Sequence, residues 1–339
     1  MHLESYNKEI VLTKVFITGA TGFIGSHLTD KLINKNYEIR CLARKTSNLR
    51  WLKDKPVELV YGDLWDDKIL EKAIEDVDYV YHVGGVNFAK KKEDYFRGNT
   101  EGTENLIKIT HRVNPDLKKF LYTSSQTAVG PSFGNKPVDE NTEYHPITTY
   151  GRSKMEAEKV VRKYFDKMNC TIVRAPAVYG PRDVAILEYF KTMSKGLQPL
   201  IGFNNKMVSL IHSSDLVDGM ILAAESEKAV SNIYFISSEK FYTWKEVGEL
   251  TSKLMNKRTI TIKIPHFIVY FVGANAQFFS MFSKKPAIMN LEKCRDLTTQ
   301  YWICSTEKAK RELGYKETLG LEKGLKDTID WYKEMKWIK

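Results

Sequence analysis

Two side chains that could move a proton lie four residues apart, Tyr150 and Lys154, at the start of a segment with helical apolar spacing. Residues four apart share one face of a helix, so the phenol and the ammonium are expected to be neighbours. A phenol, with a reference pKa of about 10, is a poor acid or base at neutral pH, and a nearby ammonium favours the phenolate. The pair therefore suits general acid–base catalysis, in which Lys154 lowers the pKa of Tyr150.

A hydroxyl that could orient a reacting oxygen lies upstream of this pair. Residues 120–125 read Phe-Leu-Tyr-Thr-Ser-Ser, which predicts a buried strand ending in hydroxyls, the usual place for functional groups in a parallel sheet. A serine there could donate to a substrate carbonyl oxygen. Each motif alone is weak, because Tyr-x-x-x-Lys arises often by chance and Ser-Ser after a strand is commonly a turn or a helix cap.

A third motif lies near the N-terminus, where an apolar run at 14–18 opens into Gly-Ala-Thr-Gly-Phe-Ile-Gly at 19–25 and then a helical pattern. Strand, glycine turn and helix in this order form a cradle for a pyrophosphate, because the turn is tight and free N–H groups of the helix face the anion. The G-x-x-G-x-x-G spacing matches the usual G-x-G-x-x-G only in part. The three motifs occur in one chain order at element edges, which argues against coincidence.

On these motifs the chain resembles the extended short-chain dehydrogenase/reductase superfamily, which includes nucleotide-sugar epimerases and dehydratases, dihydroflavonol reductases and 3β-hydroxysteroid dehydrogenases. The resemblance covers nearly the whole chain. It also rests on segments GDL at 62–64, YHVGG at 81–85, NTEGT at 99–103, RAPAVYGP at 174–181 and IHSSDL at 211–216. It implies a dinucleotide-binding Rossmann domain over residues 1–180, with a return of 209–235, and a substrate-binding lobe over 181–339. Many relatives pair through the helix that carries Tyr-x-x-x-Lys, so we expect a homodimer.

The resemblance also implies roles for single residues. Tyr150 would be the general acid or base, Lys154 would hold the nicotinamide ribose, and Ser125 would orient the reacting oxygen. Asp63 would meet the adenine of the cofactor. The other cofactor contacts implied are Gly19, Thr21, Gly22, Phe23, Ile24, Gly25, Leu64, Val83, Gly84, Gly85, Pro176 and Val178. Relatives usually carry alanines at positions 84 and 85, so the two glycines are a mild departure.

The end of the second expected strand bears on the choice of cofactor. An acidic residue there would grip the 2′-hydroxyl of NAD, whereas an arginine suits the 2′-phosphate of NADP. Residues 42–48 read Leu-Ala-Arg-Lys-Thr-Ser-Asn, which places Arg44 and Lys45 there with no carboxylate beside them. A guanidinium can bind a phosphate at two oxygens, so NADP is favoured and NAD is the alternative. Solvated surface charge is the other interpretation of the pair.

Alternation of short apolar runs with helical patterns predicts the fold. Expected strands lie at 14–18, 38–43, 57–61, 79–83, 119–123 and 171–174. Such alternation is typical of an α/β protein with a doubly wound parallel sheet. After residue 181 the pattern loosens, and segments that include 189–197, 241–254 and 306–313 are expected to build a smaller, mostly helical lobe over the carboxyl edge of the sheet. The substrate would bind between the lobes.

Three branches of the superfamily could use these residues. Sugar dehydratases carry an acidic pair just after the Ser125 position, where this chain has Gln126 and Thr127, and neither is an acid or base at neutral pH. Epimerases often place an arginine before 211–216 to clamp a diphosphate, and the equivalent here is Val208. We therefore predict a reductase or dehydrogenase of a ketone and secondary-alcohol pair. A sugar or nucleotide-sugar epimerase is the alternative, and a catalytically silent nucleotide-binding protein is the second alternative.

An uncharged, aromatic-rich stretch at 265–283 approaches transmembrane length. Its favoured interpretation is a helix that packs in the core or covers an apolar substrate pocket. Peripheral membrane contact, helped by Lys284 and Lys285, comes second. A spanning helix comes last, because polar residues, Pro265 and Gly273 interrupt the stretch. The first two interpretations fit an apolar substrate better than a sugar nucleotide.

Composition fits a cytoplasmic enzyme of 339 residues, of which 42% are apolar. The net charge of +10 is spread along the chain with no nucleic-acid motif, and the lysine run at 90–92 is interpreted as a solvated face because acidic residues follow it. The four cysteines lie far apart, which argues against a zinc site or disulfide framework, so we expect free, mostly buried thiols and no metal. Residues 1–10 lack the apolar core of a signal peptide.

Overall fold

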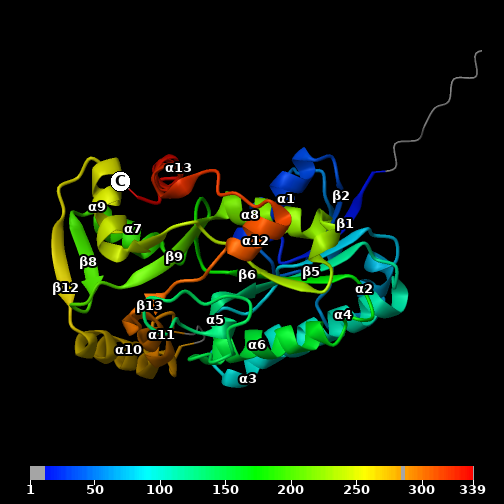
Figure 1. The fold of residues 1–339 in the computed structure, drawn as a ribbon, viewed down its shortest axis with the longest axis horizontal. Helices are drawn as coiled ribbons and strands as arrows, with labels where there is room; N and C mark the ends of the chain where they lie inside the picture. Colours follow the sequence, from blue (N-terminus) through cyan, green and yellow to red (C-terminus); the bar gives the residue numbers. More distant parts are fainter. Residues whose placement is uncertain (1–11, 284–286, 339) are drawn as a thin grey trace, which may run out of the picture.

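The computed structural model describes residues 12–283 and 287–338. At its centre lies a parallel sheet with the strand order β10-β6-β5-β4-β1-β2-β3, with helices on both faces (Figure 1). The strands of this sheet are Lys14–Thr18 (β1), Glu38–Ala43 (β2), Glu58–Tyr61 (β3), Tyr79–His82 (β4), Lys119–Ser125 (β5), Cys170–Ala175 (β6) and Asn232–Phe235 (β10). The doubly wound α/β prediction is confirmed, and each predicted strand is present.

The central strands form where the sequence is mainly apolar, because both faces of the sheet are buried there. One face is covered by the helices Phe23–Asn34 (α1) and Ser213–Glu225 (α8), whose Leu28 and Leu216 share a core cluster with Ile17 of β1. The other face is covered by Asp67–Ile74 (α2), Gly102–Val113 (α4) and Thr149–Arg162 (α6), which pack around Phe16 and Phe120. The helix expected to carry the Tyr/Lys pair is thus α6.

The strand register brings several carboxyl ends to one edge of the sheet. Thr18 at the end of β1 pairs with Leu42 of β2 and with His82 of β4. The strand order reverses at β1, because β2 and β3 lie on one side of it and β4, β5 and β6 lie on the other. Such a reversal leaves a crevice at the carboxyl edge, where open α/β sheets bind ligands.

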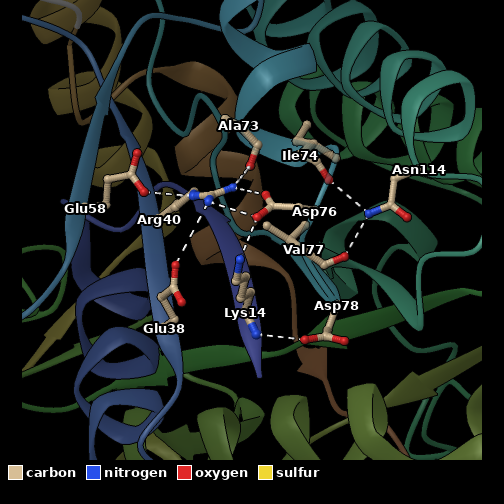
Figure 2. A network of polar contacts seen from close by, with 10 residues as sticks. All are labelled: Lys14, Glu38, Arg40, Glu58, Ala73, Ile74, Asp76, Val77, Asp78 and Asn114. Atoms are coloured by element: carbon tan, nitrogen blue, oxygen red, sulfur yellow. Dashed lines mark hydrogen bonds and ion pairs between the residues drawn. The ribbon is translucent and has the colours of Figure 1, made fainter. Parts of the chain in front are cut away.

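The opposite, amino edge of the sheet carries a network of ion pairs (Figure 2). The guanidinium of Arg40 pairs with Glu58 at 2.8 Å and with Asp76, which also accepts from the Lys14 ammonium at 2.7 Å. Hydrogen bonding from Arg40 lowers the pKa of Asp76 to about 2. The backbone nitrogen of Lys14 donates to Asp78 at 2.8 Å. These contacts tie the starts of neighbouring strands together and lie away from the ligand-binding edge.

The described residues that follow β6 and lie outside the main sheet form a region with two small sheets beside its helices. One joins β11, β9 and β13, with β7 also paired to β9, and the other joins β12 to β8. Its elements are Ala177–Tyr179 (β7), Leu187–Ser194 (α7), Leu197–Ile201 (β8), Met207–His212 (β9), Phe241–Thr243 (β11), Trp244–Leu254 (α9), Ile260–Ile264 (β12), His266–Ser280 (α10), Leu291–Thr298 (α11), Tyr301–Trp302 (β13) and Gly320–Glu334 (α13). An aromatic-rich core that includes Phe190 and Tyr332 holds α7, α9 and α13 together.

Short elements complete the described chain: Lys92–Tyr95 (α3), the π-helical turn Phe96–Glu101 (η1), Gln126–Val129 (α5), the 3₁₀ turn Glu227–Ala229 (η2) and Glu307–Leu313 (α12). The prediction that 306–313 builds the smaller lobe is wrong. Ala309 and Leu313 of α12 pack into the core cluster of β1 and α8, because their apolar face fits beside β10 at the edge of the main sheet. The four cysteines are buried free thiols, as predicted.

Candidate active site

A cavity of about 450 Å³ lies at the carboxyl ends of β1 to β4. The predicted cofactor residues that line it are Gly19, Thr21, Gly22, Phe23, Ile24, Gly25, Arg44, Asp63, Leu64, Val83, Gly84 and Gly85. Lys45, Pro176 and Val178 are not among its lining residues, and neither is the predicted catalytic group of Ser125, Tyr150 and Lys154. Sequence reasoning missed the lining residues Thr18, Leu42, Ser47, Gly62, Trp65, Val86, Asn87 and Gly98. Most of them lie beside a recognised motif at the end of a strand, and this position could have indicated that they line the cavity.

The glycine loop leaves room that side chains would fill. Gly19 has a φ of +77°, and a Cβ there would lie 2.6 Å from the backbone nitrogen of Gly84. A Cβ on Gly25 would overlap the carbonyl oxygen of Gly19. Helix α1 begins directly after this loop with no side-chain cap and no acidic residue in its first turn. Its N–H groups and the positive end of its dipole are therefore available to an anion, so the loop fits the pyrophosphate of a dinucleotide.

The cavity wall that follows β4 is held by Asn99, which sequence analysis placed in a family segment without a role. The Asn99 amide accepts from the Val86 nitrogen at 2.6 Å, donates to the Val86 carbonyl at 3.1 Å and donates to the Ser153 hydroxyl at 2.9 Å. Ser153 lies on α6 between the predicted catalytic residues. A Cβ at Gly85 would lie 3.0 Å from the Asn99 side-chain oxygen. The glycine at position 85 thus lets the wall approach this asparagine closely.

Arg44 lines the cavity at the end of β2, and its side chain is exposed. Its backbone nitrogen donates to the Ser47 hydroxyl at 3.1 Å, while the Ser47 nitrogen donates to the Arg44 carbonyl at 2.8 Å. This closed turn fixes where the arginine leaves the strand. Within residues 12–283 and 287–338, the guanidinium has no carboxylate partner. It is therefore a cation at the cavity rim that is available to a phosphate.

Ser125 lies at the carboxyl end of β5, which pairs with β4, and its hydroxyl is near the Tyr150 phenol of α6. Ser125 ends β5 and caps the short helix α5, where its hydroxyl oxygen accepts from the nitrogen and the hydroxyl of Thr127 at 3.2 and 2.9 Å. Its own proton remains available, and hydrogen bonding from Ser125 lowers the pKa of Tyr150. Burial has the larger effect and raises that pKa to about 12. Tyr150 therefore keeps its proton at neutral pH.

Lys154 lies one turn further along α6 and is 4% exposed. Its ammonium nitrogen donates to the Thr123 carbonyl at 2.7 Å and lies 4.3 Å from the centre of the Tyr122 ring. Burial lowers the pKa of Lys154 to about 7, and the charge of Glu158 opposes this effect. The expected lowering of the Tyr150 pKa by Lys154 is not seen, because the ammonium is directed to the end of β5 and burial of the phenol dominates.

Behind these residues lies a buried ion pair that fixes β5, β6 and α6. Arg174, 1% exposed, pairs with Glu158 at 2.7 Å. Glu158 also accepts from the hydroxyls of Ser124 and Tyr144, the latter at 2.7 Å. Both carboxylate oxygens of Glu158 thus accept hydrogen bonds, from β5, β6 and Tyr144. It sets the position of the strand end that carries Ser125.

Helix α11 is attached to the start of α6 by side-chain hydrogen bonds. The Glu292 carboxylate accepts from the backbone nitrogen and from the hydroxyl of Thr149, and the Arg295 guanidinium donates to the Ile147 carbonyl at 3.1 Å. The charge of Asp296 is close enough to raise the pKa of Tyr150. Nothing in the sequence motifs indicated these contacts, which join residues more than 140 positions apart.

Comparison with known proteins fits this arrangement. The model of the NAD-dependent epimerase/dehydratase family matches residues 15–237, well over half of the chain. The chain belongs to this family. The matched range holds the glycine loop, Arg44 and the group of Ser125, Tyr150 and Lys154. The predicted resemblance is therefore confirmed.

Two curated relatives match almost end to end. The ceramide reductase of Caulobacter vibrioides is 28% identical over 327 residues, 96% of each protein. The 3-beta-hydroxysteroid dehydrogenase of Mycolicibacterium neoaurum is 24% identical over 348 residues, 96% of this chain and 92% of the relative. With the family match, such relatives support an NAD(P)-dependent oxidoreductase.

Solved structures of the family share the fold. The UDP-glucuronic acid 4-epimerase of Bacillus cereus, in complex with UDP-glucuronic acid and NAD, superposes with a TM-score of 0.75 at 22% identity. The match covers 95% of this chain and all of the epimerase chain. At this identity the likeness establishes the fold alone.

Proposed function

We propose that this chain is an NADP-dependent oxidoreductase that interconverts a ketone and a secondary alcohol on a largely apolar small molecule. The observation that carries the proposal is that the Ser125 hydroxyl lies near enough to the Tyr150 phenol to lower its pKa, with Lys154 one turn further along α6. A hydrogen-bond donor and a proton donor at one point suit a carbonyl oxygen that becomes a hydroxyl.

The protonation state of Tyr150 supports the direction of reduction. With its pKa raised to about 12, Tyr150 carries a proton at neutral pH that it can give to the developing oxygen. Ser125 uses its own proton to orient that oxygen, because both lone pairs of its hydroxyl already accept from Thr127. Lys154 holds the nicotinamide ribose. A bound nicotinamide cofactor supplies the hydride, and that chemistry belongs to the cofactor.

Arg44 is the basis for choosing NADP. Its guanidinium has no carboxylate partner among the described residues, and a 2′-phosphate would supply one anion for it. The carboxylate nearest in the cavity lining, Asp63, lies at the end of β3 and accepts from the Trp65 nitrogen at 2.8 Å. Asp63 is thus left to contact the adenine. Lys45, which does not line the cavity, would add only long-range attraction.

The reductase branch is favoured by what the site lacks and by its relatives. Gln126 and Thr127 follow Ser125, so a dehydratase's acid–base pair is missing from these positions. The relatives named ceramide reductase and 3-beta-hydroxysteroid dehydrogenase point to apolar substrates. We also propose two functional lobes, with the substrate bound between them, and a homodimer paired through α6.

An epimerase acting on a sugar nucleotide is the second candidate. Its support is the fold shared with NAD-bound epimerases. Val208 counts against it, because this position offers no cation to clamp a diphosphate.

A hydride-transfer experiment separates the two. Purified protein is incubated with NADPH deuterated at C4 of the nicotinamide and with a 3-oxosteroid or a long-chain 3-oxo ester. We expect consumption of NADPH in equal amount to the alcohol formed, with deuterium on the new carbinol carbon. Interconversion of nucleotide sugars without net loss of NADPH would contradict the proposal and favour the epimerase.

A further inference from the structure

Helix α10 presents its phenylalanines to the outside of the molecule. Among its fifteen residues only Val269 and Gly273 are buried. Phe267, Phe271, Phe278 and Phe279 are 72%, 69%, 53% and 66% exposed, and Phe282, in the turn just after the helix, is 78% exposed. The favoured interpretation of this stretch, core packing or the cover of a pocket, is therefore wrong for its aromatic face. Figure 1 shows α10 at one end of the molecule beside α11.

The large apolar side chains of α10 lie on its exposed face, whereas those of an ordinary surface helix lie on its buried face. Val269 and Gly273, four residues apart, form the seam that packs on α11, where a Cβ on Gly273 would collide with Cys294. The exposed phenylalanines at 267, 271, 278 and 282 recur at helical spacing on the opposite face. A helix of a globular domain normally buries such a stripe. Here the small residues face the protein and the large apolar residues face outward.

The C-terminal end of the exposed face is a cluster of aromatic rings. The rings of Phe278 and Phe282 lie 5.6 Å apart, as do those of Phe278 and Phe279. Contiguous apolar surface of this kind marks an interaction site, whereas scattered apolar residues do not.

Three polar side chains of α10 have hydrogen-bond partners. Asn275 donates to the Phe271 carbonyl at 2.7 Å, and Ser280 donates to the Gln277 carbonyl at 2.7 Å. Gln277 in turn accepts from the Leu291 nitrogen at 3.1 Å. These hydrogen bonds lower the cost of placing the helix next to an apolar medium.

Positive charge borders the aromatic face. The stretch 265–283 contains no acidic residue. At its C-terminal end the Lys90 ammonium donates to the Ser283 carbonyl, across 193 residues of sequence. The exposed Lys91 and Lys92 follow directly, and the acidic Glu93 and Asp94 come immediately after them in the first turn of α3. The lysine run that looked like a plain solvated face thus lies beside an apolar surface, in the arrangement of a helix that binds anionic lipids.

The length of α10 fixes how it could meet a bilayer. Fifteen residues make a helix of about 22 Å, which is shorter than the hydrocarbon core of about 30 Å. Across residues 12–283 and 287–338, none of the helices has the length and apolarity needed to cross a membrane. An apolar face on a helix too short to span indicates a position in the plane of the interface.

We propose that α10, with Phe282 and the lysines at 90–92, docks this protein on the surface of an anionic lipid bilayer. The phenylalanines at 267, 271, 278 and 282 enter the boundary between headgroups and acyl chains, and the lysines contact the phosphates. Docking would set the active site at a fixed height above the lipid, because α11 packs on α10 and holds the start of α6 through Glu292. Docking would also let an apolar substrate pass from the bilayer to Tyr150, and this consequence alone rests on the proposed function.

Vesicle sedimentation tests the docking surface directly. The full chain is mixed with vesicles of equal parts phosphatidylcholine and phosphatidylglycerol, and with vesicles of phosphatidylcholine alone. We expect wild type to sediment with the anionic vesicles, and the double variant Phe271→Asp/Phe278→Asp to bind them about tenfold more weakly or less. Lys91→Glu should weaken binding to the anionic vesicles and make the binding that remains less sensitive to salt. Met335→Asp, at the 43% exposed end of α13, is the matched control and should bind as wild type does.

Two results would overturn the proposal. In one, wild type stays in the supernatant with the anionic vesicles; in the other, the double Phe variant sediments as strongly as wild type and keeps the wild-type melting temperature. If wild type ignores vesicles but elutes as a dimer that the Phe variant breaks, the aromatic face joins two copies of the chain instead. An NADPH titration of the same samples keeps the two proposals separate, since a protein that binds vesicles but no dinucleotide contradicts the proposed function alone.

Discussion

The Glu292 carboxylate binds both the backbone nitrogen and the hydroxyl of Thr149, at 2.8 and 2.7 Å. Thr149 is the first residue of α6 and directly precedes Tyr150. A carboxylate at a helix N-terminus pairs with N–H groups that the helix cannot satisfy and interacts favourably with its dipole. One side chain of the second lobe thus supports the helix that carries the proposed proton donor.

Removal of this contact should cost stability. Glu292→Ala is expected to lower the free energy of unfolding by about 1 kcal/mol, the usual loss for a helix cap. Glu292→Gln, which keeps one acceptor oxygen, should lose less. Urea unfolding measures both. Glu249→Ala is the control, because its pair with Lys245 is exposed and long, at 3.7 Å, and should contribute little. Equal free energies of unfolding for Glu292→Ala and wild type would show that the contact does not stabilise the fold.

Two glycines of the loop should respond differently to a methyl group. Gly25→Ala would force the new Cβ onto the Gly19 carbonyl, and we expect a loss of about 1–3 kcal/mol together with loss of dinucleotide binding. Gly22→Ala places its Cβ 3.3 Å from the same oxygen, so a small shift can accommodate it. Thermal unfolding and NADPH titration report the two effects. A Gly25→Ala protein that binds NADPH like wild type would contradict the proposal that the glycine loop binds the pyrophosphate.

Lys154 should make stability depend on pH. Unfolded, this lysine holds its proton up to about pH 10.5, whereas burial lowers its folded pKa to about 7. Between these values the unfolded state binds more protons, so the free energy of unfolding should rise with pH by at most about 1.4 kcal/mol per unit. Lys154→Met should remove that rise and stabilise the protein at pH 7.

Lys119 provides the matched control for this measurement. It is also buried, with its pKa lowered to about 8 by burial, but it donates to the Ser226 carbonyl at 3.0 Å, away from the cavity. Lys119→Met should flatten stability above pH 8 and leave turnover intact, whereas Lys154→Met should lose turnover as well. An unchanged pH profile in Lys154→Met would mean that Lys154 stays charged when folded.

Loss of the Tyr150 hydroxyl should stop the reaction without disturbing the cofactor. Tyr150→Phe is expected to lower kcat by a factor of about 10² to 10⁴, the usual contribution of a general acid, with NADPH affinity nearly unchanged. Tyr95→Phe is the control, since its ring lies 6.3 Å from that of Tyr150 but has no proposed chemical role. Steady-state kinetics on the ketone found by the hydride-transfer screen compare the variants, and wild-type activity of Tyr150→Phe would remove it from the mechanism.

The sheet and the glycine loop could be predicted because their signals are local. Mainly apolar runs such as 14–18 and 119–123 coincide with β1 and β5, since a strand buried on both faces must be largely apolar. The loop at 19–25 lies directly after β1, so its place at the carboxyl edge followed from the parallel sheet. Arg44 lines the cavity for the same reason.

Other features depend on tertiary packing and had no local signal. The sequence places Lys154 near Tyr150 but does not show that its ammonium turns to the Thr123 carbonyl, which requires the end of β5. The contact of Glu292 with Thr149 spans 143 positions. In α10 the apolar composition was evident, but which face would be covered depends on the small residues at 269 and 273 that pack on α11.

The most direct test of the account is a titration of the purified protein with NADPH and with NADH, for wild type, Arg44→Ala and the control Lys45→Ala. We predict that wild type binds NADPH at least tenfold more tightly, a difference of about 1.4 kcal/mol. Arg44→Ala should erase that difference and Lys45→Ala should largely keep it, because only Arg44 lines the cavity. Equal affinity of wild type for NADH, or a protein that purifies with NAD already bound, would contradict the NADP-dependent reductase and favour the epimerase.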